Sequence, residues 1–461
     1  WVGEHVEQAA PRSLAVRYLS GVHLDQPPGG SATPRLTLAI EATDLTLRPL
    51  KAMSPVEAPR ALIRLEGPAL EVSVPDAAYA LGPGRRVPLK TVRFAVPDVL
   101  ASAPLGELTF KAQGALPPAL DLLSQEPIAL FKTSGVPTDG VDGKLDGHFK
   151  LLVPLDGRAA VGDLRPEGKV RIFDAKAGKS LVPGYDVQGA TVLVDLSPQA
   201  IDAKGEVLVS GVNAKLAWQH IFDAPADRQP PLRITASLDQ TDRNQLGLDV
   251  NHIVQGTVSL IVTVEPKGRD ASSAVRVRAD LTATELMLEG VAWTKPPGRA
   301  AFLEFDVVRG KPGRTELQNL QLKGDDVAIE GWAVLGPDNR FREFHLPTFT
   351  LNLVSRLDIA GRLQGEIWDI KAKGSNFDGR EFFRALFSMG QIGDKVQRPL
   401  RPRDGVDIEA DIDNVMGFEQ TTLKSVRLKL SKRADRLVSL HARGLLDGGQ
   451  PVVASVAAEA G

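Results

Sequence analysis

Cysteine is absent from the 461 residues of this chain, and its absence removes several kinds of site at once. Without thiols the protein has no disulfide, no thiolate metal ligand and no cysteine nucleophile. Such a composition is typical of an oxidising compartment, where stray thiols are avoided, although cytoplasmic proteins also lack cysteine. The absence therefore constrains the chemistry of the chain more than its location.

Aromatic residues and net charge are both low. Aromatic residues make up 5% of the chain, with three Tyr and five Trp, which is too few for the paired aromatic girdles of an outer-membrane barrel. The same scarcity makes a sugar-stacking surface a poor expectation. The formal net charge of −2 gives no general attraction to nucleic acid, so no nucleic-acid partner is expected.

Long hydrophobic runs are also missing. The longest aliphatic run, TVSLIVTV at 257–264, is far shorter than the ~20 residues that span a bilayer as a helix. The chain opens at Trp1 without a charged leader and ends in the Ala-rich VVASVAAEAG. We therefore expect a piece of a longer protein, with any membrane anchor outside these residues.

No catalytic or metal-binding motif stands out. The sequence has no HExxH, GxSxG or Walker motif, and no GxGxxG that follows a strand, so no catalytic residue, metal or cofactor is expected. A β-rich carbohydrate-active enzyme ranks last among the alternatives, because no carboxylate pair is identifiable. The histidines are scattered singly: His5, His23, His148, His220, His252, His345 and His441.

One acidic stretch, DGVDGKLDG at 139–147, places Asp139, Asp142 and Asp146 close together. Their spacing does not fit the calcium loop of an EF-hand, and Asp-Gly pairs are common turn formers. We therefore interpret this stretch as turns.

Strand-like alternation is the dominant signal. In AVRVRADLTATELMLEG at 274–290, apolar and polar residues alternate as far as Ala283, and the parity then slips, which predicts a bend near Thr284 and Glu285. With 43 Gly and 33 Pro, the chain has the turn residues that many short strands need. Similar alternation occurs at 35–50, 61–75, 90–96, 168–175, 190–196, 257–264, 300–308, 348–354 and 424–430.

Helical signals are few, at 1–10, 118–131 and 377–390. In the last of these, Asp378 is a plausible N-cap for an amphipathic helix near 378–390. Its apolar face fits either a plug in the core or a lid over an apolar channel, and both would bury the same side chains: Phe382, Phe383, Leu386 and Phe387.

Acidic and basic strands lie close together near the C-terminus. VDIEADID at 406–413 has Asp407, Glu409, Asp411 and Asp413 on one face. KSVRLKLSKR at 424–433 follows it with Lys424, Arg427, Lys429, Lys432 and Arg433. One functional interpretation is that the first strand forms a carboxylate site and the second forms a patch that binds anionic lipid. We favour neighbouring strands whose solvent faces pair acid with base.

A short pattern of an apolar residue, a polar residue, Ala, a polar residue and Gly recurs at irregular spacing, which suggests one supersecondary unit used repeatedly. Its copies are FKAQG at 110–114, IDAKG at 201–205, IKAKG at 370–374 and LHARG at 440–444, with VAIEG at 327–331 as a looser copy. We predict three β segments: 1–135 with short helices, 136–270, and 271–461 with the amphipathic helix.

Several segments, in their order, resemble the periplasmic region of the AsmA-like family, specifically its YhdP type. They cover roughly 120–461, and the stretch with Trp293, Lys295, Pro296 and Gly298 is the most specific. The segments are PIALFKTSGVPTDGVDGKLDGHFKLLVPL (127–155), RPEGKVRIFDAKAGKSLVPGYDVQGATVLVDL (165–196), IDAKGEVLVSGVNAKLAW (201–218), DLTATELMLEGVAWTKPPGRAAFLEFDV (280–307) and GSNFDGREFFRALF (374–387).

This resemblance implies a mainly β fold, in which an elongated, twisted antiparallel sheet curls into an open groove, or trough, with a few short helices. It also implies a periplasmic, inner-membrane-anchored, bridge-like lipid-transfer protein of a Gram-negative bacterium, with phospholipids as partners and possible outer-membrane contacts. The alternative, suggested by the related TamB type, is an assembly factor for outer-membrane proteins that acts by strand addition.

If the chain binds lipid, the apolar faces of its strands are expected to line the groove, since bare apolar surface is unfavourable in water. The residues predicted to line it are Leu36, Leu38, Ile40, Val258, Leu260, Val275, Val277 and Leu281.

Overall fold

The structure of the protein, a computed structural model, divides into two compact units. Unit 1 comprises Trp1–Ile234 with Glu265–Ser273, and unit 2 comprises Thr235–Val264 with Ala274–Gly461. The three segments predicted from the sequence divide the chain more finely and stay a prediction. The residues that the structure describes are 6–19, 35–47, 54–82, 85–124, 140–155, 166–182, 184–248, 250–265, 275–288, 293–309, 313–380, 382–384, 405–419, 421–433 and 436–457.

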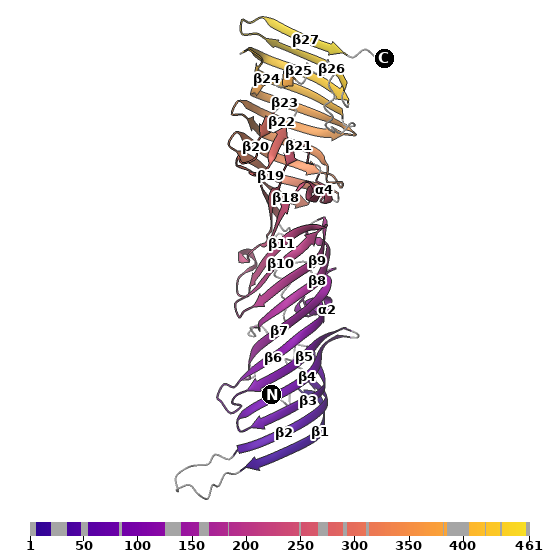
Figure 1. The fold of residues 1–461 in the computed structure, drawn as a ribbon, viewed down its shortest axis with the longest axis vertical. Helices are drawn as coiled ribbons and strands as arrows, with labels where there is room; N and C mark the ends of the chain where they lie inside the picture. The colour runs from indigo at the N-terminus through magenta and orange to yellow at the C-terminus, as the bar shows by residue number, and fades with distance from the viewer. Residues whose placement is uncertain are drawn as a thin grey trace. The chain divides into compact units, whose positions relative to one another are not determined.

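Unit 1 is an antiparallel meander in which each strand from β1 to β10 pairs with the next strand in the sequence (Figure 1). Helix α2, Leu116–Ser124, contacts β4, β5 and β7. A 3₁₀ turn, Ala226–Arg228, follows the last strand. The strands are β1 Val6–Leu19, β2 Arg35–Leu47, β3 Val56–Glu66, β4 Ala69–Gly82, β5 Arg85–Val96, β6 Leu105–Ala115, β7 Asp142–Pro154, β8 Pro166–Val182, β9 Tyr185–Leu196, β10 Ala200–Val209 and β11 Val212–Ile221.

In unit 2, the described strand pairs of the large sheet are all antiparallel except β23–β24. Strand β12, Leu232–Leu238, contains the boundary between the units. The strands of the sheet are β14 Val258–Val264, β15 Val275–Asp280, β18 Ala301–Arg309, β19 Thr315–Gly324, β20 Val327–Leu335, β21 Phe341–Leu351, β22 Ser355–Gln364, β23 Ile367–Asp378, β24 Gly405–Met416, β25 Thr422–Arg433, β26 Arg436–Leu445 and β27 Pro451–Ala457.

Unit 2 also contains helix α4, Gln240–Gln245, and a small three-stranded sheet. It is formed by β13 Val254–Gln255, β16 Glu285–Leu288 and β17 Trp293–Lys295. The predicted bend near Thr284 and Glu285 is confirmed, because β15 ends at Asp280, a turn follows, and β16 then joins this separate sheet.

Single residues with a left-handed backbone interrupt several long strands. Asp44 in β2, Thr91 in β5, Asp174 in β8, Asn319 in β19 and Ser425 in β25 have φ values of 56, 47, 53, 52 and 52°. Such residues create bulges that bend a strand and increase its twist. The ladder register shifts beside Thr91, Asp174, Asn319 and Ser425.

Small residues make up much of one buried cluster in unit 1. Ala61 has no exposed surface, and Ala42 pairs with it across β2 and β3. Ala58 and Ala77 lie in the same buried cluster as Leu45 and Val74. The side chains packed against this cluster come from β3, β4 and β5 of the same sheet, as expected where a sheet curls on itself: Val56, Val72, Leu89 and Val92. The predicted fold, a mainly β chain forming an open, curled sheet, is confirmed.

Of the predicted helices, the one at 1–10 is wrong and the one at 118–131 is confirmed in part. The segment 1–10 was expected to begin a helix, but Val6 already belongs to strand β1. Its alternation across Val6–Leu19 pairs it with β2, and tertiary pairing of this kind overrides weak helical signals. The predicted helix at 118–131 begins at Leu116 and is seen as far as Ser124, before the described residues stop.

Candidate functional site

The inner face of each sheet, defined as the face that carries its buried residues, is lined by continuous rows of apolar side chains. In unit 1 one row crosses from β2 to β8, and every side chain in it remains partly exposed. Residues that pair across a ladder point to the same face, so the row is a single stripe. Its members are Ile40, Ile63, Val72, Phe94, Leu108, Leu151 and Pro166.

A longer row crosses unit 2 from β14 to β27. It contains only apolar residues and one glycine, and it continues through the parallel pair of β23 and β24. Phe344 lies over that glycine, because a Cβ on Gly361 would stand 2.4 Å from its ring. The row consists of Val264, Val275, Val307, Leu317, Ala333, Phe344, Gly361, Ile370, Ile408, Leu430, Leu440 and Val456.

Charged side chains are segregated to the opposite, outer face. Neither row contains a charged residue, whereas the intervening positions form cross-strand ion pairs such as Arg93 with Glu71 and Arg276 with Asp306. An inner face that is apolar and, along these rows, partly exposed can hold hydrocarbon.

The predicted groove residues fall on both units. Leu38 and Ile40 lie on the inner face of β2, while the side chain of Leu36 lies outside the described residues. In unit 2, Leu260 is partly buried on β14. Buried on the inner face of the same sheet are Val258, Val275, Val277 and Leu281. The prediction therefore selected inner-face positions in both units, and their binding of lipid stays a prediction.

The Phe-rich segment begins a crossover connection. Parallel strands need a long connection between them, and this one leaves β23 at Asp378 and returns at Gly405. The helix starts one residue later than predicted, because the carbonyl of Gly379 accepts the first helical bond, from the Phe383 amide at 2.8 Å. Asp378 still accepts from the amide of Arg380 at 3.3 Å.

Phe382 and Phe383 are partly buried, and the Phe382 ring meets Phe377 of β23 edge to face at 6.3 Å. Leu386 and Phe387 lie outside the described residues. Both the plug and the lid interpretation therefore remain open.

The Trp293–Lys295 stretch, the most specific part of the resemblance, forms the interior of the small sheet. Trp293 is almost fully buried, and so is Lys295. The Lys295 ammonium donates to the carbonyl oxygens of Thr284, Arg299 and Pro296 at 2.8, 2.9 and 3.0 Å. Burial lowers the pKa of this lysine. Lys295 thereby ties the turn after β15 to the loop after β17, which is a structural role.

The acidic strand β24 and the basic strand β25 pair as predicted. On their outer face, Glu409 lies opposite Lys429 with a 2.7 Å ion pair, and Asp411 lies opposite Arg427 at 3.6 Å. Two cations of the predicted basic set do not join this ladder. Lys424 pairs with Asp447, and Lys432 stands in register with Val406.

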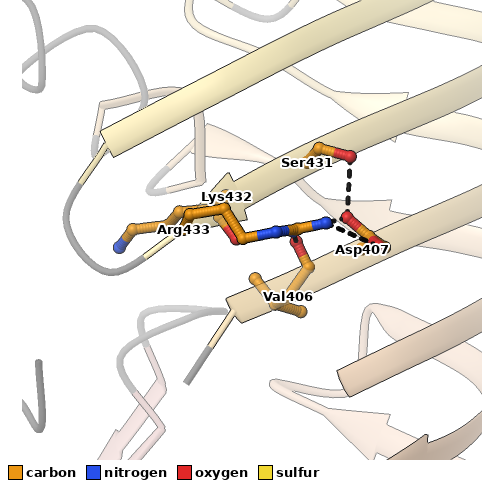
Figure 2. Close-up of polar contacts among 5 residues, drawn as sticks. All are labelled: Val406, Asp407, Ser431, Lys432 and Arg433. Carbon is orange, nitrogen blue, oxygen red and sulfur yellow. Dashed lines mark hydrogen bonds and ion pairs between the residues drawn. The ribbon is translucent and has the colours of Figure 1, made fainter. Parts of the chain in front are cut away.

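Asp407 ends the ladder with a two-pronged contact that Figure 2 shows. The Arg433 guanidinium donates to both carboxylate oxygens at 2.7 and 3.0 Å, and the Ser431 hydroxyl donates to one of them at 2.7 Å. Hydrogen bonds from Arg433 and Ser431 lower the pKa of Asp407. These partnered carboxylates have the character of a solvated strand face.

Other predicted polar positions are also dispersed. Asp142 begins β7, and Asp146 accepts a 3.0 Å hydrogen bond from Gln113, whereas Asp139 lies outside the described residues. Across the described part of the chain, no cluster of His, Asp and Glu side chains is arranged to hold a metal ion. Within the same residues, no helix combines the length and apolarity needed to cross a membrane.

Comparison with known proteins identifies no relative. No protein-family model, curated protein or solved structure matches this chain. Its function therefore has to be inferred from its own geometry.

One group of inner-face residues was not recognised in the sequence. Trp218, His220 and Phe222 follow one another with period two at the end of β11, and their rings are neighbours. The alternation was visible in AWQHIF at 217–222, but a polar residue at a core-facing position gave no signal by itself.

Proposed function

We propose that this chain is a non-enzymatic lipid-transfer segment whose apolar inner faces bind the acyl chains of phospholipids. The observation that carries the proposal is the continuity of the apolar rows, especially the one that crosses unit 2 from Val264 to Val456. A core residue normally touches other side chains on every side, whereas Phe344, Ile370 and Ile408 in this row keep exposed surface.

The energetics favour a mobile apolar ligand. Covering apolar surface contributes about 25 cal/mol per Å² removed from water, so an open apolar face gains stability when hydrocarbon covers it. Successive strands present similar aliphatic side chains, so an acyl chain that moves from one strand to the next exchanges like contacts for like. Transfer along a row then needs no chemical step.

From the resemblance to the AsmA-like family, we propose that the segment works in the periplasm, is anchored to the inner membrane through residues outside this chain, and delivers phospholipid toward the outer membrane. That location and those partners belong to the proposal.

Native mass spectrometry of protein purified without detergent tests the proposal. We expect mass additions that correspond to phospholipids, and extraction with organic solvent should identify them. Protein that is folded by circular dichroism yet carries no lipid, and takes none from phospholipid vesicles, would contradict the proposal.

A second candidate, assembly of other β proteins by strand addition, is favoured by the edge strand β27. Among the described residues this strand pairs only with β26. Val453 and Val456 on it are 66% and 49% exposed, and an exposed apolar edge can accept another strand. Crosslinking from β27 to an unfolded outer-membrane protein, with the inner face free of lipid, would favour this alternative.

A further inference from the structure

The outer face of unit 2 carries an exposed tryptophan among its charged side chains. Trp332 of β20 precedes Ala333, a member of the apolar row, so its side chain points to the outer face. It is 36% exposed, whereas the other tryptophans whose side chains the structure describes are buried or partly buried: Trp218, Trp293 and Trp368. Trp332 therefore leaves a large, rigid apolar surface in contact with solvent.

A hollow lies beside Trp332, where the neighbouring strand bulges. The ladder between β19 and β20 shifts between Leu317 and Leu320, and Asn319 within this stretch has a φ of 52°. The hollow has a volume of about 470 Å³, which is within the usual range of small-molecule sites, about 300 to 1,000 Å³. Trp332 lines it together with polar side chains from the β19 side: Arg314, Glu316, Gln318 and Asn319.

The polar side chains of the hollow hold one another in place. Glu316 accepts a hydrogen bond from Arg314 through one carboxylate oxygen and from Gln318 through the other, both at 3.1 Å. These two contacts lower the pKa of Glu316, so its carboxylate is ionised at neutral pH. A carboxylate oxygen accepts more than one hydrogen bond, and a guanidinium has five N–H donors. The group can therefore both donate to and accept from a ligand.

The charges near Trp332 are paired and of mixed sign. Arg314 and Glu316 form an ion pair within the hollow. His345, whose ring meets Trp332 edge to face at 6.3 Å, contacts Asp358 at 2.9 Å. An anion would meet the Glu316 carboxylate, and a cation would meet the Arg314 guanidinium. A neutral ligand rich in hydroxyl groups fits these surroundings best.

We propose that the hollow beside Trp332 binds a pyranose ring of a saccharide. The flat C–H face of such a ring is apolar and packs on the exposed indole, while its hydroxyls exchange hydrogen bonds with Glu316, Gln318 and Arg314. The low aromatic content of the chain argues against an extended stacking surface, but a single sugar ring needs only one tryptophan. This site is independent of the proposed lipid binding, because it lies on the face opposite to the apolar rows.

The test uses four trisaccharides that differ in linkage and substituents: cellotriose, maltotriose, chitotriose and mannotriose. Binding to the whole chain is measured by calorimetry, and saturation-transfer NMR identifies the sugar protons that contact the protein. We expect at least one trisaccharide to bind, and the C–H protons on one face of a ring to receive the strongest saturation.

Three variants make the test specific. Trp332→Ala should weaken binding by at least about tenfold, since truncation of a central tryptophan contact usually has a large effect. Glu316→Gln keeps the indole and the size of the side chain and should also weaken binding, so the proposal can be tested even if Trp332→Ala does not fold. The matched control is Phe302→Ala, which should bind as the unchanged protein does. Phe302 lies on the outer face of β18, is 38% exposed and does not line the hollow.

Failure of the folded protein to bind any of the four trisaccharides would overturn the proposal. Binding that Trp332→Ala and Glu316→Gln leave unchanged would also overturn it, because the sugar would then lie elsewhere. Binding of tetramethylammonium at Trp332 in place of the sugars would identify a cation site instead. None of these results affects the lipid-transfer proposal, which is tested with phospholipid at the opposite face.

Discussion

Replacing Val194 with Asp separates lipid binding from folding, because the next residue of the same strand provides a control on the other face. Val194 lies on the inner face of β9 between Val170 and Ala203 and is partly exposed. Leu193 lies on the outer face between Arg171 and Lys204 and is 59% exposed.

The magnitude follows from the surroundings of each position. A carboxylate placed against hydrocarbon costs about 2 to 3 kcal/mol, which corresponds to a loss in affinity of roughly 30- to 140-fold. Asp is too short to extend its charge back to water as Lys or Arg would. Leu193→Asp puts the same charge between two cations in solvent, where surface substitutions usually stay within about 0.5 kcal/mol.

The assay is the binding of a pyrene-labelled phospholipid in detergent-free buffer, with circular dichroism and thermal unfolding as checks on the fold. Val194→Asp should bind weakly with native strand content, and Leu193→Asp should bind as the unchanged protein does. If the two folded variants bind equally well, the inner face of unit 1 does not hold the acyl chains, and the reasoning from the apolar rows is refuted.

Three further predictions concern the sheet itself. Gly374→Ala should destabilise unit 2 by about 1 to 3 kcal/mol in urea unfolding, because the new Cβ would stand 2.2 Å from a carbonyl oxygen of the neighbouring strand. Gly448→Ala, which meets nothing within 4 Å, should be neutral or slightly stabilising, and similar losses in both variants would contradict the argument. Lys295→Met should cost at least about 1 to 3 kcal/mol, since buried carbonyl oxygens lose their donor, and a Tm unchanged by calorimetry would refute that role. The pKa of Asp407 is lowered in the folded state, so this carboxylate stabilises the fold above the unfolded pKa of about 3.9, and the stabilisation is lost as pH falls through the folded pKa. Asp407→Asn should therefore reduce the dependence of the unfolding free energy on pH in the acid range. An unchanged dependence would count against the contact with Arg433.

Local patterns in the sequence predicted what depends on neighbouring residues. Alternation identified the strands, the parity slip located the turn before Glu285, and opposite charges predicted the pairing of β24 with β25. Each of these features requires only that adjacent side chains alternate between two faces.

The features that the sequence did not reveal depend on contacts between distant residues. The parallel pairing of β23 with β24 follows from a crossover, and alternation is the same in parallel and antiparallel strands. At the bulges, Asp44 tolerates a left-handed backbone only moderately and Thr91 tolerates it poorly. The residue types therefore did not predict these bulges. The burial of His220 on the inner face became apparent only when its pairing with Ile201 was known.

The meander of unit 1 determines how the free energy of folding is distributed among its strands. From β1 to β11 each strand pairs only with the strands next to it in sequence, so the described sheet behaves as a chain of nearest-neighbour interfaces. In such an arrangement the free energy is approximately a sum of local terms, and damage at one strand spreads mainly to its two neighbours. Hairpins could therefore be gained or lost in evolution without rebuilding the remainder, and the length of the apolar face could change one strand pair at a time.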